Sequence, residues 1–454
     1  MTLNEEAQVR VVINERADEI VRRFGNLPAT EEIGIVNVSP RRERLGGPNS
    51  RFWKCSIEYR IGGEHSTNSL NTINFYVESS SRGKDEQKIG DEEMSIKHDT
   101  YRLFKESGIT PDVFRLNGLP RTIFMTSVGM RTLEDKTGLK FGNKRVFDSN
   151  QRTQFYHAGV DLLRAFHDIA ERRIPVLMSG EYFRLVHLLD RRRKQDTGMK
   201  LTGKFRRFLS SECDSGAGEF SRLIEPVARM IDSHKIYLIH GDAGAQNFVG
   251  PNWYKNGDDE PDEQEAKRVW SAKDMKLIDL YDLRWGHDMQ DIGRLATSLP
   301  LELTPDEWNS GIEQYLSGDR DRIWKKPVAR SFFGSQREVQ QELSENQIVK
   351  DIYTMFYASA IESSISRRFS LENVRRGEPD KYNAMLFERP VLMNSEGYNG
   401  INLIMAVEYV AGKKDLFSWN DEEVDRLKKL ESFLINCGVI PNVLPSCSSS
   451  KTSQ

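Results

Sequence analysis

The run His240-Gly241-Asp242-Ala243-Gly244-Ala245-Gln246-Asn247-Phe248 is the segment that decides the fold, and Ile278-Asp279-Leu280 follows it downstream. The order is His-x-Asp, four further residues, Asn, and then an Asp after an apolar stretch. Kinase-type phosphotransferases place a catalytic base and two metal ligands along the chain in this order. The segment therefore predicts a site for phosphoryl transfer.

Three oxygen-bearing side chains each have a task in such a site. A carboxylate near the attacking hydroxyl takes or orients its proton, and Asp242 fits this task. Mg²⁺ prefers oxygen ligands and usually keeps several waters, so Asn247 and Asp279 are the expected metal ligands. Gly241 lets the backbone turn tightly before the base. The expected cofactors are therefore ATP and Mg²⁺.

Length and composition bound the class of protein. A chain of 454 residues is expected to form two or three packed units, and 38% hydrophobic with 29% charged residues is typical of a globular protein. No apolar run approaches the length that crosses a bilayer, and the charged N-terminal residues lack the apolar segment of a secretory signal. We therefore expect a cytoplasmic protein without a membrane partner.

Charge and cysteine usage exclude two further classes of site. The net charge of -3 gives no global field that attracts nucleic acid, and the basic run 191–194 is interpreted as a solvated helix face. The four cysteines are scattered without paired spacing, which indicates neither a zinc site nor a disulfide framework.

The first third of the chain has an α+β pattern. Apolar residues at helical spacing predict a helix over residues 4–24 that stops at Gly25, and a second helix is expected over 92–107, closed by Gly108. Short β-rich runs between Gly, Pro, Asn and Ser predict antiparallel strands at 34–38, 52–61, 72–79 and 121–128.

The remainder is mainly helical. Helical patterns occupy residues 151–172, 178–194, 203–211 and 217–233, and residues 301–440 continue as helices with loops. Two short strands, 237–240 and 275–280, are expected to deliver Asp242 and Asp279 to the site. The polar and acidic insertion 251–273 between them is expected to be an exposed hairpin or loop.

Several segments resemble the aminoglycoside phosphotransferase and choline kinase family. HGDAGAQNF at 240–248 looks like the HGD catalytic loop of that family, and IDLYDLRWGHDMQDIGRLA at 278–296 looks like its ID segment. Weaker likenesses lie at 159–169 and 124–135. The resemblance implies an α+β, protein-kinase-like two-lobe fold with an N-terminal antiparallel sheet plus helix and a mainly helical C-terminal lobe.

The residue patterns and the resemblance together predict the domain boundaries. They comprise an N-terminal helical extension, a nucleotide-binding lobe, a catalytic and acceptor-binding lobe and a disordered tail, at residues 1–32, 33–128, 129–440 and 441–454 respectively.

The same resemblance implies residue roles. Asp242 would be the catalytic aspartate, with Asn247 and Asp279 as magnesium ligands. His240 would support the loop, as would a buried His167 behind it. Two acids, Asp288 and Asp291, would brace the loop or cap the helix that follows. The adenine-binding hinge would be formed by the backbone of Met125, Thr126, Ser127 and Val128.

The chain departs from the family pattern at the lysine that holds the α and β phosphates. Glu78 stands on the third strand where this lysine is expected, and Lys97, or with a shifted turn Asp99, stands near the place of its acidic partner. A reversed pair is one option. The other is that Lys54 or Lys84 supplies the cation.

The loop that covers the phosphates is equally open. The best candidate is the segment 44–52, where Gly46 and Gly47 could bring backbone amides close to a phosphate. Gly-Gly-Pro is also a generic turn.

The function predicted from these residues is ATP-dependent transfer of the γ-phosphoryl group to a hydroxyl of a small molecule, with region 301–440 helping to form the acceptor pocket. One alternative is a pseudokinase-like nucleotide or partner-binding protein, motivated by the missing strand lysine. Another is a protein kinase, against which the chain shows no Arg beside Asp242 and no activation-loop sequence. The acceptor, the choice of ATP over GTP and the oligomeric state stay open.

Overall fold

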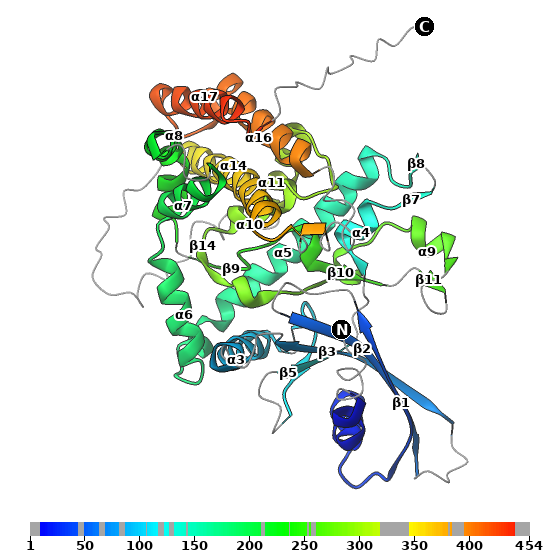
Figure 1. Cartoon of the computed structure of the whole chain (residues 1–454). Coiled ribbons are helices and arrows are strands. Elements are labelled where there is room, and N and C mark those ends of the chain that lie inside the picture. The colour runs from blue at the N-terminus through cyan, green and yellow to red at the C-terminus, as the bar shows by residue number, and fades with distance from the viewer. Residues whose placement is uncertain are drawn as a thin grey trace, which may run out of the picture.

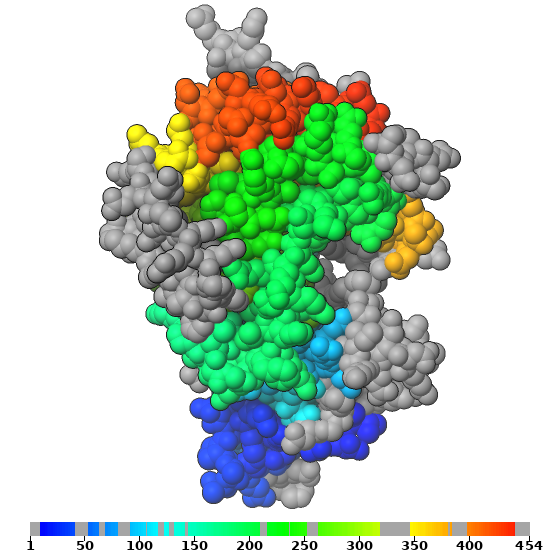
Figure 2. Space-filling view, turned by 90° about the vertical axis from the view of Figure 1, so that its left-hand side faces the viewer, coloured from blue at the N-terminus to red at the C-terminus, as the bar shows by residue number. Residues whose placement is uncertain are grey.

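A computed structural model of the chain is shown in Figure 1. It describes residues 10–43, 50–62, 69–80, 87–105, 107–116, 122–126, 131–141, 144–209, 214–235, 237–251, 254–255, 260–317, 345–379, 382–383 and 395–440. The predicted tail at 441–454 lies outside these residues. In the space-filling view, the blue N-terminal part and the red C-terminal helices lie at opposite ends of the molecule (Figure 2).

The N-terminal lobe is built on a five-stranded antiparallel sheet in the order β1-β2-β3-β5-β4. Its strands are β1 (Ile33–Glu43), β2 (Ser50–Ile61), β3 (Asn71–Ser80), β4 (Val113–Phe114) and β5 (Thr122–Thr126). All four predicted strands are present, and β1 and β2 form the longest pairing, from Ile33 opposite Ile61 to Glu43 opposite Phe52.

The two faces of this sheet have different neighbours because side chains alternate along a strand. Trp53, Cys55 and Ile57 of β2 are buried on the face covered by helix α2 (Ala17–Gly25), the dark blue helix below the sheet in Figure 1. The other face carries Tyr76 and Met125, which pack with Met94 of α3 (Gln87–Leu103). The second face is the one directed toward the helical lobe.

Helix α3 ends earlier than the sequence predicted. It stops at Leu103 because the next residues form tighter turns, with Phe104 N bonded to Tyr101 O and Ser107 N to Phe104 O. Gly108 then adopts a left-handed conformation with φ of 73°. The glycine therefore belongs to the connection and does not cap the helix.

The C-terminal lobe is mainly helical. Helix α5 begins with a capping box, in which Asp148 Oδ1 accepts a hydrogen bond from Gln151 N and Gln151 Oε1 accepts one from Asp148 N. All residues of the short α10 are buried, so it lies at the centre of the lobe. The helices are α5 (Ser149–Leu177), α6 (Phe183–Arg193), α7 (Thr197–Leu209), α8 (Asp214–Ser233), α10 (Asp288–Ala296), α11 (Pro305–Leu316), α14 (Glu345–Gly377), α16 (Ser395–Gly412) and α17 (Asp421–Asn436).

Two small sheets carry the predicted catalytic segments. Strand β9 (Tyr237–Ile239) pairs with β14 (Arg284–Gly286), and β10 (Phe248–Gly250) pairs with β13 (Lys276–Leu277) and β6 (Arg131–Thr132). The predicted strand 275–280 is shorter than expected because Asp279 adopts a left-handed conformation with φ of 56°, which ends the ladder.

The described residues of the acidic insertion include a hairpin, one of the two predicted options, but the insertion is not wholly exposed, because Ala266 and Trp270 are buried in the core. Strands β11 (Tyr254–Lys255) and β12 (Glu260–Pro261) pair, and helix α9 (Glu263–Lys267) follows. The buried Lys136 of α4 (Leu133–Thr137) donates to Glu265 O at 2.5 Å and Ala266 O at 2.9 Å. This cation satisfies carbonyls at the end of α9, so the insertion is anchored to the lobe.

The predicted fold class is confirmed: an N-terminal antiparallel sheet with a helix precedes a mainly helical lobe. Among the helices that the structure describes, none combines the length and apolar character needed to cross a membrane.

Candidate active site

The HGD loop turns sharply at Gly241. This residue has a φ of 85°, and a Cβ added to it would lie 2.2 Å from the carbonyl oxygen of Asp282. The left-handed conformation suits glycine, and the close backbone leaves no room for a side chain. Gly241 therefore fixes the position of Asp242 against the loop that follows Asp279.

We expect Gly241→Ala to lower the free energy of unfolding by about 2–5 kcal/mol, the sum of about 1–2 kcal/mol for left-handed strain and about 1–3 kcal/mol for overpacking. Gly108→Ala is the matched control, because Gly108 has a φ of 73° but no atom within 4 Å of an added Cβ. It should lose only the strain contribution. Denaturant unfolding of both variants measures the difference, and equal losses would show that the Asp282 carbonyl moves aside.

Asp291 braces the catalytic loop from helix α10. Its carboxylate accepts hydrogen bonds from His240 N at 2.7 Å and Gly241 N at 2.9 Å, and it contacts His167 Nε2 at 3.0 Å. Burial opposes the charge of Asp291, but the hydrogen bond and charge of His167 outweigh it and hold its pKa below the ordinary value. The loop amides are thus bonded to a carboxylate that stays ionised.

His240 and Asp288 have structural contacts. His240 is fully buried, and its Nε2 donates to Ile278 O at 2.8 Å, which ties the HGD loop to the segment that carries Asp279. Asp288 accepts from Tyr315 Oη at 2.7 Å. It does not cap α10, since His287 Nδ1 accepts the hydrogen bond from Met289 N. Of the two roles predicted for Asp288 and Asp291, bracing by Asp291 is seen and capping is not.

The carboxylate of Asp242 lies among cations. Arg294 Nη1 is 3.5 Å from its Oδ1, and Arg294 Nη2 donates to Glu362 on α14 at 2.6 Å. Burial opposes the charge of Asp242, but Arg294 and Arg367 outweigh it and hold its pKa below the ordinary value. With 31% of its side chain exposed, Asp242 is an ionised carboxylate that a ligand can reach.

Asn247 directly precedes β10 and Asp279 follows β13, so the pairing of these two strands brings the two residues close together. Asn247 Nδ2 donates to Asp242 O at 2.6 Å and lies 3.2 Å from its Oδ2, while the backbone N of Ile278 donates to Asn247 O at 2.9 Å. Burial and the neighbouring acids Asp282 and Glu78 raise the pKa of Asp279 despite the opposing charge of Lys97. The structure therefore brings the three predicted residues together.

These donors fit Mg²⁺. The amide nitrogen of Asn247 is used by Asp242, which leaves its oxygen available, and a cation would relieve the repulsion that Asp279 experiences. No group of three or more His, Cys, Asp or Glu side chains in the described ranges could hold a metal by itself. Such a site suits an ion that takes one or two protein oxygens and completes its shell with phosphates and water.

The reversed pair at the third strand is present. Lys97 Nζ on α3 lies 2.5 Å from Glu78 Oε1 on β3 and 4.0 Å from Asp279 Oδ1. Burial works against the charge of Lys97, but Glu78 and Asp279 outweigh it and raise its pKa. Tyr101, one turn further along α3, accepts a hydrogen bond from Asp279 N at 2.9 Å. Helix α3 therefore connects the sheet to Asp279.

The predicted nucleotide-binding residues are only partly described. Met125 and Thr126 end β5, with Met125 buried opposite Tyr76. Lys54 pairs with Tyr76 across β2 and β3, so it lies on the sheet face directed toward the helical lobe. Ser127, Val128, Gly46, Gly47 and Lys84 lie outside the described residues.

Three residues of the site were not predicted from the sequence. Arg284 and Arg294 lie within the segment 278–296, but no spacing rule distinguished them from surface arginines. Glu362 is remote in sequence and meets Arg294 only through the packing of α10 against α14. Arg192 corrects the interpretation of 191–194 as a solvated face, because it donates to Tyr281 O and Leu283 O.

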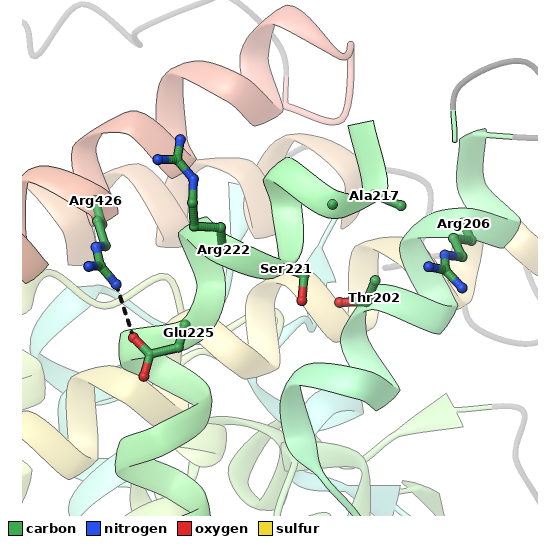
Figure 3. A pocket seen from close by; sticks show the side chains of 8 residues that line it. Thr202, Arg206, Ala217, Ser221, Arg222, Glu225 and Arg426 are labelled. Atoms are coloured by element: carbon green, nitrogen blue, oxygen red, sulfur yellow. Dashed lines mark hydrogen bonds and ion pairs between the residues drawn. The ribbon is translucent and has the colours of Figure 1, made fainter. Parts of the chain in front are cut away.

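A second pocket of about 490 Å³ opens between α7, α8 and α17, and the three residues of the HGD site do not line it. Figure 3 shows the hydroxyls of Thr202 and Ser221 facing each other across it, with Arg206 on the α7 side. Arg426 at its far edge pairs with Glu225 at 3.2 Å and with Glu422 at 2.5 Å. This pocket is distinct from the site around Asp242.

No protein-family model and no curated protein sequence matches the chain. Solved structures similar to it include an ethanolamine kinase of Plasmodium vivax (11% identity, covering 79% of this chain and 81% of that one, TM-score 0.41). Another is a choline kinase of Streptococcus pneumoniae (11%, 93% and 99%, TM-score 0.39). A third is an ADP-bound aminoglycoside phosphotransferase (13%, 77% and 98%, TM-score 0.36). Likeness of this extent carries no inference about substrate or activity.

Proposed function

We propose that this chain is an ATP-dependent phosphotransferase that acts on a hydroxyl group of a small molecule. The observation that carries the proposal is that Asn247 is bonded to Asp242 through its side chain, while its backbone carbonyl is bonded to Ile278, the residue before Asp279. A chance cluster of surface turn residues would not share paired strands, a buried histidine and a bracing carboxylate.

The chemistry follows from the charge state of Asp242. The acceptor oxygen forms a bond to the γ-phosphorus as the bond between that phosphorus and the β–γ bridging oxygen breaks, and ADP leaves with the electron pair. Asp242, ionised and within reach of a ligand, accepts the hydroxyl proton and later releases it to solvent. Mg²⁺ held by Asn247 and Asp279 would neutralise charge on the phosphates.

Lys97 is our candidate for the cation that contacts the α and β phosphates. It comes from α3 where related enzymes are expected to use a strand lysine, and Glu78 on β3 takes the place of the acid. Its ammonium lies between Glu78 and Asp279, so a phosphate bound beside Asp279 would meet it. The missing strand lysine therefore no longer favours a non-catalytic protein.

A thermal-shift titration with ATP, GTP and a non-hydrolysable ATP analogue, with and without Mg²⁺, tests the proposal. A nucleotide that binds the native state raises the melting temperature by mass action, and saturation at about 100 times Kd should raise it by about 3–5 °C. We expect the shift to require Mg²⁺ and to be lost in Asp279→Ala.

The matched control is Asp190→Ala, which removes a carboxylate with a 36% exposed side chain from α6, against 46% for Asp279. It should keep the full shift. If no nucleotide shifts the wild-type protein with Mg²⁺ present, the phosphotransferase proposal is wrong, and a partner-binding role becomes the better hypothesis.

A further inference from the structure

The site around Asp242 has more positive charge than the proposed chemistry uses. Asp242 is adjoined by Arg294, and the charges of Arg367 and Arg284 also act on it. Arg367 is already engaged, because it donates to Thr297 O at 2.8 Å and Arg294 O at 3.0 Å at the end of α10. Arg294 is shared between Asp242 and Glu362.

Arg284 is different. The stem of this side chain runs beside the HGD turn, since a Cβ added to Gly241 would lie 3.1 Å from Arg284 Cγ. Within the described part of the chain, its guanidinium has neither a hydrogen bond nor an ion pair. Burial and the charge of Arg294 lower the pKa of Arg284, although the charges of Glu362, Asp291 and Asp282 oppose this shift. The side chain of Arg284 is partly exposed, so an anion that enters from solvent can bind its guanidinium.

Helix α7 adds a second cation on the same side. Lys204 donates to Ser366 at 2.6 Å and Ser370 at 3.0 Å, and Arg376 further along α14 donates to Phe208 O. The later residue on α7, Phe208, contacts the later residue on α14, Arg376, so the two helices run parallel where they meet. Lys200, one turn before Lys204, is consequently level with Glu362.

Lys200 also lacks a bonded partner among the residues that the structure describes. It is exposed, and its pKa is lowered by partial loss of solvent and by the charge of Arg284, against the opposing charges of Glu362 and Asp282. Lys204 shows the same effect more strongly, with burial lowering its pKa to about 8. The carboxylates of Asp282 and Glu362 act on both cations, but neither the Arg284 guanidinium nor the Lys200 ammonium is bonded to one of them in the described part of the chain.

We propose that the acceptor is a hydroxyl compound carrying an anionic group, and that Arg284 and Lys200 bind this group while the hydroxyl faces Asp242. The proposal rests on the phosphotransferase function above and specifies its substrate class. A planar guanidinium binds carboxylate or phosphate through two parallel hydrogen bonds, and an ammonium adds a point charge. Cationic acceptors would be repelled by the same residues.

Binding is tested first, on the Mg-ADP-bound protein so that no turnover occurs. Inorganic phosphate and, separately, tricarballylate are titrated while the melting temperature is followed, and at least one should raise it. The shift should be lost in Arg284→Gln and reduced in Lys200→Gln. Arg206→Gln is the control for the second pocket, because it removes an exposed arginine from another face of α7 (Figure 3). Absence of any shift, or a shift lost only in Arg206→Gln, would overturn the proposal.

Turnover is tested with acceptors that share a skeleton and differ in charge: glycerol, glycerate and glycerol 3-phosphate, then glucosamine, glucose, gluconate and glucose 6-phosphate. ADP release should be faster with anionic members, and the carboxylate and phosphate arms identify the anion. Arg284→Gln should raise KM for the preferred acceptor about 10- to 100-fold, the worth of a hydrogen bond to a charged group, while KM for ATP stays unchanged.

The outcomes separate the two proposals. Faster turnover of neutral or cationic acceptors would overturn the anionic-acceptor proposal and leave the phosphotransferase function standing. An equal fall of kcat with every acceptor, together with a raised KM for ATP, would show that Arg284 contacts the γ-phosphate instead. A charge-selective anion shift without turnover of any acceptor would support the anion site and count against the phosphotransferase function.

Discussion

Asp242→Asn is expected to reduce phosphoryl transfer by about 10²- to 10⁴-fold, the range attributed to a positioned general base, while the Mg-ATP-dependent thermal shift persists. The amide has the same shape and keeps the contact with Asn247, but it cannot accept the hydroxyl proton. Because Arg294 and Arg367 outweigh burial and hold the pKa of Asp242 below its ordinary value, the charge of Asp242 contributes stability at neutral pH. The variant should therefore have a slightly lower free energy of unfolding. ADP release at saturating acceptor measures the effect.

Asp161→Asn is the matched control for this change. Asp161 has a side chain 34% exposed and lies 3.4 Å from Arg164, close to the 31% and 3.5 Å of Asp242 with Arg294, but it is on the surface of α5. Its replacement should leave turnover unchanged. Full activity in Asp242→Asn would remove this residue from the catalytic step and, with it, the assignment of the HGD loop.

Lys97→Met is expected to lower the free energy of unfolding by about 3–5 kcal/mol, because it leaves Glu78 buried without a partner. The side chain of Glu78 is only 3% exposed, so solvent cannot replace the lost ammonium. The same change should raise KM for ATP by about 10-fold or more, as a hydrogen bond to a charged phosphate is lost. Denaturant unfolding and ADP release give the two values independently.

The double variant Glu78→Leu/Lys97→Met separates structure from function. An apolar pair of similar volume often replaces a buried ion pair without loss, so stability should recover toward the wild type. The KM for ATP should stay high, because no cation is restored beside Asp279. If the free energy of unfolding and the KM for ATP both return to the wild-type values, Lys97 serves packing alone and another cation, such as Lys54, contacts the nucleotide.

The sequence by itself determined the elements whose signals are local. The spacing from Asp242 to Asn247, the β-rich runs before residue 80 and the periodicity of α5 each depend on a few neighbouring residues. For this reason the fold class and the central strands could be predicted, and a hairpin was one of the two options for the acidic insertion. The end of α3 and the short β13 were missed, because turn geometry at Leu103 and Asp279 outweighed the pattern.

Only the tertiary structure decided which charges meet. Asp291 accepts hydrogen bonds from the amides of the HGD loop, and Glu78 pairs with Lys97. Arg294 contacts both Asp242 and Glu362, and these three residues come from three different segments of the chain. Burial makes these partners indispensable, since a charge removed from water must find an opposite charge or a set of hydrogen bonds. Partners distant in sequence carry no mutual signal along the chain, and so the packed structure was needed to choose the Glu78–Lys97 pair from the options left open and to bring Arg284 beside the HGD turn.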